Sequence, residues 1–237
     1  MPGAVKTEAV VLRSIRFGEA DRVLHLYAER RGRIGAIAKG SRRPRSRFGG
    51  RLEPFFRLDL VLHEGRGELM TVTSAATVAA HPRLRESGPA LGAAARACDS
   101  VLRLLDAPDP NDAAYNLLCR YLALLDERGD AGHATALSFR LKLALAAGFV
   151  PELSACAHCG EGDGLVAFSG SAGGVVCGAC EAGGFEISPE AHRFMVDALG
   201  RPLAEAPAAE GRTLRQVERA VNETVEHHAH VRLRAAA

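Results

Sequence analysis

The chain lacks the features of membrane and secreted proteins. None of its apolar runs reaches the ~20 residues that a membrane-spanning helix needs. Its first residues, MPGAVKTEAVVLRS, lack the basic-then-apolar pattern and the small-residue cleavage site of a signal peptide. We therefore expect a cytoplasmic protein that has no membrane partner.

Familiar catalytic motifs are also missing. Lysine occurs only at positions 6, 39 and 142, and none of them lies in a G-x4-G-K-[ST] phosphate-binding loop. The chain has no G-x-S-x-G elbow and no H-E-x-x-H zinc motif. Asp106, Asp109 and Asp112 recur every three residues, but Pro108 and Pro110 interrupt them, so helix capping explains them better than metal chemistry. We expect a protein that is not an enzyme.

Acidic residues are absent from residues 30–52, which hold nine cations. The remaining 21 cations face 28 carboxylates, so the rest of the chain has a net charge of −7 although the total is +2. Such a local field attracts polyanions better than the total charge suggests. The alternative is a basic loop that is merely solvated.

The first part of the chain has the period-two alternation of strands. Apolar residues alternate in residues 23–28, 34–38 and 56–63, and further short strands fit residues 8–14 and 69–74. Five short strands within about 75 residues suit a small closed barrel, because closure removes exposed edges.

Helical spacing begins near residue 82. Apolar stripes run through residues 91–105, 114–125 and 137–145, and another helical pattern begins at Ser188 and Pro189. Asp109 and Pro110 are expected to cap the second helix, and Gly148 to end the third. The fold class is α+β: a five-stranded barrel, then an all-α domain with a metal module inserted in it. The predicted boundaries are 1–80 for the barrel, 81–150 and 187–237 for the helical domain, and 151–186 for the insert.

Four cysteines in the insert have the spacing of a zinc site. Cys156 and Cys159 form one C-x2-C pair, and Cys177 and Cys180 form another after seventeen residues. Four thiolates bind Zn²⁺ in a closed tetrahedron, so we expect one structural zinc ion. Disulfides and a redox dithiol are the alternatives. Disulfides fit poorly with a chain that lacks a secretion signal. A redox dithiol needs only one C-x2-C pair, so it fits poorly with two matched pairs. His158 could replace a thiolate, but it is expected to be exposed.

Several segments together resemble the RecO family of bacterial recombination mediators. The resemblance rests on residues 17–22 (FGEADR), 31–40 (RGRIGAIAKG), 42–44 (RRP) and 46–54 (SRFGGRLEP). Residues 139–143 (FRLKL) and 148–151 (GFVP), which lead into the four-cysteine insert, match in order, so the similarity covers essentially the whole chain.

The resemblance implies an N-terminal OB (oligonucleotide-binding) barrel, a helical domain and a zinc module. It also implies binding of single-stranded and duplex DNA, annealing of complementary strands, and work with RecR to load RecA onto strands coated by single-strand-binding protein. RecF is a further partner reached indirectly, and a nucleoid-associated location follows. The zinc ligands of the family carry over as Cys156, Cys159, Cys177 and Cys180.

Sequence-independent DNA binding relies on neutralising phosphates, so the basic segment supplies the candidate contacts. The candidate DNA-binding residues are Arg31, Arg33, Lys39, Arg42, Arg43, Arg45, Arg47 and Arg51. A Gly-rich loop at residues 42–51 is expected to project several guanidiniums from the barrel. Phe17, Tyr27 and Phe48 are the candidates for stacking on bases, whereas Phe55 and Phe56 are expected in the core.

Two other functions remain open at this point. An RNA-binding or ribosome-associated factor would share the basic barrel and the zinc ribbon. A hydrolase with an unrecognised site is disfavoured by the missing motifs.

Overall fold

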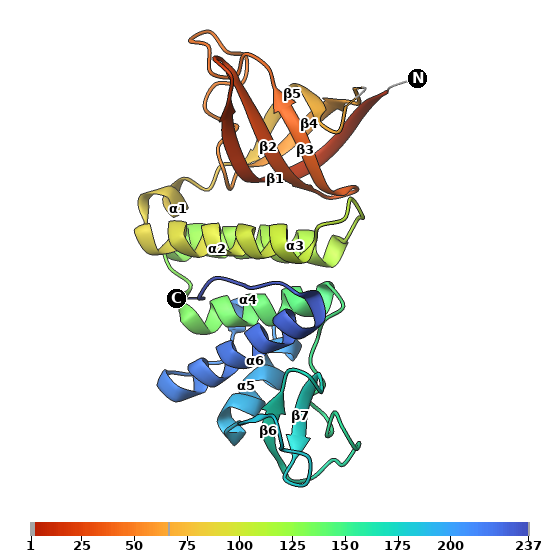
Figure 1. Ribbon diagram of the computed structural model, residues 1–237. Helices are drawn as coiled ribbons and strands as arrows, with labels where there is room; N and C mark the ends of the chain where they lie inside the picture. Colours follow the sequence, from red (N-terminus) through yellow and green to blue (C-terminus); the bar gives the residue numbers. More distant parts are fainter. Residues whose placement is uncertain (1–2, 66, 237) are drawn as a thin grey trace. The chain divides into compact units, whose positions relative to one another are not determined.

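The computed structural model describes residues 3–65 and 67–236, and the chain divides into two compact units. Unit 1 is Met1–Gly129 and unit 2 is Asp130–Ala237 (Figure 1). Each unit is described by itself. Within the described residues no helix is both long and apolar enough to cross a membrane.

Unit 1 begins with the predicted five-stranded barrel. The strands are β1 (Ala4–Phe17), β2 (Asp21–Ala28), β3 (Gly32–Ala38), β4 (Arg57–His63) and β5 (Met70–Ala79). They close in the order β1-β2-β3-β5-β4, with β3 and β5 parallel and the other pairs antiparallel. This closed arrangement is of the OB type.

The barrel closes because β1 is long enough to pair with both of its neighbours. Its first half pairs with β4 and its second half with β2, and a bulge between Val11 and Arg13 lies within the pairing with β2. Alternate residues of β2 and β3, such as Leu24, Leu26 and Ala36, point into the barrel and are fully buried. The period-two pattern in the sequence therefore marks the inner wall.

The basic loop, residues 39–56, joins β3 to β4 and folds back onto the barrel. Backbone bonds from Arg43 to Gly40, from Ser46 to Arg43 and from Gly49 to Ser46 wind it into successive turns. Phe48 and Leu52 are 1% and 2% exposed and belong to the barrel core. These two buried side chains hold the backbone of the loop against the barrel, while Arg43 and Arg45 stay exposed, so only part of the expected set of guanidiniums projects freely.

Three helices complete unit 1: α1 (Pro82–Glu86), α2 (Gly88–Leu104) and α3 (Asp112–Arg128). The phenol of Tyr115 on α3 lies 3.4 Å from a carboxylate oxygen of Glu8, which also pairs with Arg57. These contacts attach α3 to β1 and β4. On α1 the guanidinium of Arg85 stacks on Phe56 and donates to the Pro54 carbonyl, so the helix holds the end of the basic loop.

The expected cap of α3 at Asp109 was wrong by two residues. Asn111 is the N-cap, and its side chain accepts a hydrogen bond from the backbone N–H of Ala114 at 2.9 Å. The backbone of Asp109 instead packs against Gly32 at the β2–β3 turn, where an added Cβ would lie 2.1 Å from the Asp109 carbonyl oxygen. This tertiary contact keeps Asp109 and Pro110 outside the helix.

Unit 2 combines helices with a small three-stranded sheet. Its elements are α4 (Gly132–Ala146), β6 (Leu165–Ser169), β7 (Gly174–Cys177), β8 (Phe185–Glu186), α5 (Pro189–Gly200), the short 3-10 helix η1 (Leu203–Glu205) and α6 (Gly211–Ala229). Ser188 caps α5 as the sequence indicates, through the N–H of Ala191. Phe168, Val175 and Phe185 of the sheet share one core with the apolar faces of α4, α5 and α6. The sheet is therefore part of the helical fold rather than an appendage.

The close contact at Gly32 predicts a large loss of stability on substitution. Gly32 and Gly18 both have positive φ, at 61° and 54°, but only Gly32 has atoms within 4 Å of an added Cβ. Gly18→Ala should cost about 1–2 kcal/mol for the left-handed conformation alone. Gly32→Ala should cost at least ~2 kcal/mol more, because the β2–β3 turn and the α2–α3 loop must separate. Denaturant unfolding of both variants gives the comparison, and equal losses would show that the contact contributes nothing.

Candidate nucleic-acid interface and metal centre

The eight predicted DNA-binding residues fall into two groups at the two ends of β3. Arg31 and Arg33 lie at the β2–β3 turn, and the other six lie on or beside the basic loop. A seven-residue strand with a rise of ~3.3 Å per residue separates the two groups by about 20 Å. They are therefore two ends of a surface rather than one cluster.

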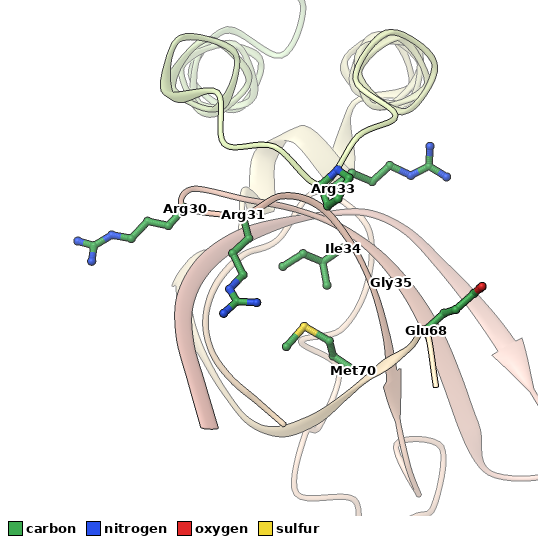
Figure 2. A pocket seen from close by; sticks show the side chains of 8 residues that line it. Arg30, Arg31, Arg33, Ile34, Gly35, Glu68 and Met70 are labelled. Carbon is green, nitrogen blue, oxygen red and sulfur yellow. The ribbon is translucent and has the colours of Figure 1, made fainter. Parts of the chain in front are cut away.

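The group at the β2–β3 turn borders a cavity of about 460 Å³ that Ile34, Met70 and Pro108 also line. Figure 2 shows Arg31 pointing toward Ile34 and Met70, whereas Arg30 and Arg33 point away from the cavity. Arg31 is paired with Glu64 at 2.6 Å, and Arg33 donates to the carbonyl oxygen of Leu102 at 3.4 Å. Because the three guanidiniums diverge, they do not form a pocket for a single anion.

Three arginines of the basic loop bond to the barrel itself. Arg51 donates to the Ala75 carbonyl at 3.1 Å, Arg47 to the Val72 carbonyl at 3.5 Å, and Arg42 to the Gly18 carbonyl at 3.2 Å. Arg47 directly precedes the buried Phe48, and Arg51 directly precedes the buried Leu52. Each arginine therefore fixes one turn of the loop, and the residue that follows it enters the core. No local pattern in the sequence marks these two arginines as anchored, because their acceptors lie on β5.

Lys39, Arg43 and Arg45 are the free cations of the loop. All three are exposed, and within the part of the chain that the structure describes their side chains have no hydrogen-bond or ion-pair partner. A phosphate can therefore approach them without displacing an internal bond. They are the strongest candidates among the eight for phosphate contacts.

The prediction that an aromatic residue stacks on bases was wrong for two of the three candidates. Tyr27 and Phe48 are each 1% exposed, because Phe48 fills the barrel and Tyr27 is buried within unit 1. Burial raises the pKa of the Tyr27 phenol to about 12. Phe17 at the end of β1 is 56% exposed, so it stays a candidate for stacking on bases. Phe55 is buried and Phe56 packs against the core, as expected.

In unit 2 the four predicted cysteines come together. The sulfurs of Cys156, Cys159, Cys177 and Cys180 all lie within 4.8 Å of one another, and those of Cys159 and Cys177 are 3.7 Å apart. Four thiolates at 2.3 Å from a zinc ion in a tetrahedron would be about 3.8 Å apart. The four cysteines, here called the four-thiol cluster, can therefore hold a metal ion after a small contraction.

The local fold places each sulfur. The bond from the Gly160 N–H to the Cys156 carbonyl, at 2.8 Å, closes the first knuckle, and one from Cys180 to Cys177, at 2.9 Å, closes the second. Between the knuckles β6 and β7 pair as an antiparallel hairpin, and β7 ends at Cys177. His158 is exposed on the first knuckle, as expected, and is not among the clustered ligands.

The pKa values of the clustered cysteine thiols also favour the binding of a cation. Desolvation opposes ionisation of Cys156, but nearby backbone N–H groups outweigh it and lower the pKa of this thiol to about 6. Burial, with the neighbouring thiols, raises the pKa of Cys180 to about 12. Four sulfurs this close cannot all be thiolates at neutral pH unless a cation neutralises them.

Fold and site together define a class of protein: an OB-type barrel covered by a basic loop, joined to a helical unit with a four-thiol cluster. The family described as "Recombination protein O N terminal" matches residues 1–81, and "Recombination protein O C terminal" matches residues 85–236. The chain belongs to the RecO family of DNA repair and recombination proteins.

Curated relatives that cover three quarters or more of the chain agree with this assignment. A "DNA repair protein RecO" of Rubrobacter xylanophilus is 40% identical over 229 residues, which cover 94% of this chain and 90% of the relative. One of Anaeromyxobacter dehalogenans is 35% identical over 98% of this chain and 94% of its own length. One of Pelotomaculum thermopropionicum is 42% identical over 75% of this chain and 68% of its own length.

If the four-thiol cluster holds a metal ion, loss of one ligand should destabilise unit 2 selectively. Cys177→Ser removes one ligand, and we expect it to abolish stoichiometric metal content and to cost at least ~2 kcal/mol, because metal binding energy is folding energy in such sites. Elemental analysis and hydrogen exchange provide the readouts, with protection lost in β6, β7 and α5 but retained in β1–β5. His158→Ala is the matched control within the same knuckle and should keep its metal. A wild-type protein with no metal and four reactive thiols would contradict the prediction.

Proposed function

We propose that this protein is a non-catalytic recombination mediator that binds single-stranded and duplex DNA through unit 1. In this proposal it anneals complementary strands and, with RecR, helps load RecA onto strands coated by single-strand-binding protein. RecF would be reached indirectly. One observation carries the DNA-binding role: a basic loop is held over an OB-type barrel and leaves Lys39, Arg43 and Arg45 exposed without partners in the described structure.

Charge supports the division of labour between the barrel and the rest of the chain. Residues 30–52 carry nine cations and no carboxylate, whereas the remainder has a net charge of −7 and would repel phosphate. We therefore assign DNA to the barrel and protein partners to the helices, with the domain boundaries predicted from the sequence. The anchoring contacts of Arg47 and Arg51 support a positioning role for these two residues rather than direct phosphate contact.

We also infer that the four-thiol cluster holds one structural Zn²⁺. Its donor set is four thiolates, which is the set that zinc takes in closed structural sites. The ion would be remote from the DNA-binding loop in sequence and would act by holding β6, β7 and the two knuckles together. The elemental analysis described above identifies the metal.

The free loop cations should dominate the salt dependence of DNA binding. The variant Lys39→Glu, Arg43→Glu, Arg45→Glu removes three candidate phosphate contacts. Each contact contributes about −0.7 to the slope of log affinity against log salt on single strands, so the slope should flatten by about 2. Affinity for a mixed-sequence oligonucleotide is measured from low to high salt, and a thermal melt checks the fold.

The matched control is Arg120→Glu, Arg193→Glu, Arg215→Glu, which changes the net charge equally at exposed helix positions. It should leave the slope nearly unchanged. If both triple variants flattened the salt slope equally, the loop would contribute only general charge. The basic loop would then be merely solvated.

The mediator function predicts annealing of coated strands. Complementary oligonucleotides covered by single-strand-binding protein should anneal faster with the protein than without it. Loading of RecA on such strands should need added RecR. RNA strands of the same sequence separate this function from that of an RNA-binding or ribosome-associated factor: preference for RNA, with no stimulation of DNA annealing, would favour the alternative.

A further inference from the structure

The four residues of the four-thiol cluster differ in their exposure to solvent. Cys156 and Cys177 are 3% and 7% exposed, and both belong to a small core with residues of β6 and β7. Cys180 is half-buried and packs against the same core. Cys159 is exposed and is not part of that core. A small solute can therefore reach Cys159 more easily than the other three cysteines.

The exposure of Cys159 follows from the fold of the first knuckle. The N–H of Gly160 donates to the Cys156 carbonyl at 2.8 Å, and the N–H of Cys156 donates to the Glu161 carbonyl at 2.7 Å. These bonds fold the knuckle into a surface loop, in which every residue from 158 to 164 is exposed. Cys177, in contrast, is the last residue of strand β7. The cluster therefore joins one sulfur from a surface loop to others from a packed sheet.

A second sulfur lies close to that of Cys159. The Sγ atoms of Cys159 and Cys177 are 3.7 Å apart, and the two residues come from different knuckles. The S–S bond of a disulfide is about 2.05 Å long, so the two sulfurs would have to approach by roughly 1.7 Å. A surface loop can supply a movement of this size. An accessible cysteine beside a second thiol is the arrangement of residues that peroxide oxidises reversibly.

We propose that Cys159 is the residue at which hydrogen peroxide oxidises this protein, and that the product is a disulfide between Cys159 and Cys177. The proposal rests on the structural zinc site inferred above. A thiol that coordinates zinc is deprotonated, and the thiolate is the form that acts as a nucleophile. Among four coordinated thiolates, the exposed one meets a dissolved oxidant first.

The reaction has two steps. The Cys159 thiolate attacks one oxygen of hydrogen peroxide, the O–O bond breaks, and hydroxide leaves, so that Cys159 becomes a sulfenic acid. The Cys177 thiolate then attacks the Cys159 sulfur, the S–S bond forms as the S–O bond breaks, and a second hydroxide leaves. The two thiolates lose two electrons in total, and peroxide gains them.

The disulfide would replace the metal ion as the link between the two knuckles. Only Cys156 and Cys180 remain as thiols, and two ligands are too few for a closed four-coordinate zinc site. The metal is therefore released, while β6 and β7 stay bracketed by a covalent bond. A thiol reductant reverses the reaction by thiol–disulfide exchange, after which the four thiols can bind metal again.

Thiol mapping of the full chain as purified tests the site. The protein is treated with less than one equivalent of hydrogen peroxide, free thiols are alkylated, and the disulfide is identified by mass spectrometry. Released zinc is measured with a colorimetric chelator. We expect the Cys159–Cys177 disulfide, with zinc released in step with it and rebound after reduction. Cys98 and Cys119 are internal controls that should stay reduced, because burial raises the pKa of both thiols.

Two outcomes of the mapping would overturn the proposal. One is oxidation of Cys156 or Cys180 before Cys159, and the other is a disulfide within one knuckle. A purified chain without zinc would contradict the inferred metal site. The order of thiol oxidation in that chain would still decide whether Cys159 is the reactive residue, so the two failures can be told apart.

Two histidine variants provide a second test with matched donor sets. Cys159→His and Cys180→His each leave three thiolates and one imidazole, which is also a set that structural zinc takes. Cys180→His keeps Cys159 and Cys177 and should release its metal to peroxide at the wild-type rate. Cys159→His should release it at least about fivefold more slowly, because the thiolate that reacts first is gone. Equal rates of release from the two variants would overturn the proposal. If either variant holds no metal, the thiol mapping of the wild type decides.

Discussion

Burial of Phe48 and Leu52 inside the barrel is the constraint on which the DNA-binding proposal depends. These two side chains fix the middle of the basic loop, and burying them contributes about 3–6 kcal/mol in total. Arg47 and Arg51 then reach the carbonyls of β5, and Lys39, Arg43 and Arg45 face solvent. A loop that carried only charge would sample many positions. The apolar anchors make it a surface with a defined set of free cations.

Structural support and ligand binding are also separated between the two units. In unit 1 the helices contact the barrel through Tyr115 and Arg85, and these contacts secure β1, β4 and the end of the basic loop. In unit 2 the small sheet shares its core with three helices, so a metal ion held by the four-thiol cluster would stabilise the helical fold as well as its own hairpin. Metal binding in this account is a folding device, and DNA binding belongs to the other unit.

Sequence patterns predicted the elements whose signals are local. Period-two alternation located β2, β3 and β4, short strand segments were also expected within β1 and β5, and cysteine spacing identified the four clustered sulfurs. Long-range packing decided the features that were missed. Phe48 lies among arginines and glycines, so nothing local marks it as buried. β1 extends to Phe17 because β2 pairs with it, and Asn111 rather than Asp109 caps α3 because Asp109 packs on Gly32. Which arginines are anchored could not be predicted without the positions of the β5 carbonyls.

The central claim is that the basic loop of unit 1 binds single-stranded DNA, and photocrosslinking tests it most directly. An oligonucleotide with 5-iodouracil at successive positions is irradiated in complex with the full chain, and the crosslinked residues are identified by mass spectrometry. The account predicts crosslinks at Phe17 and within residues 39–47. Crosslinks concentrated in α4, α5 or α6, with none in unit 1, would contradict it.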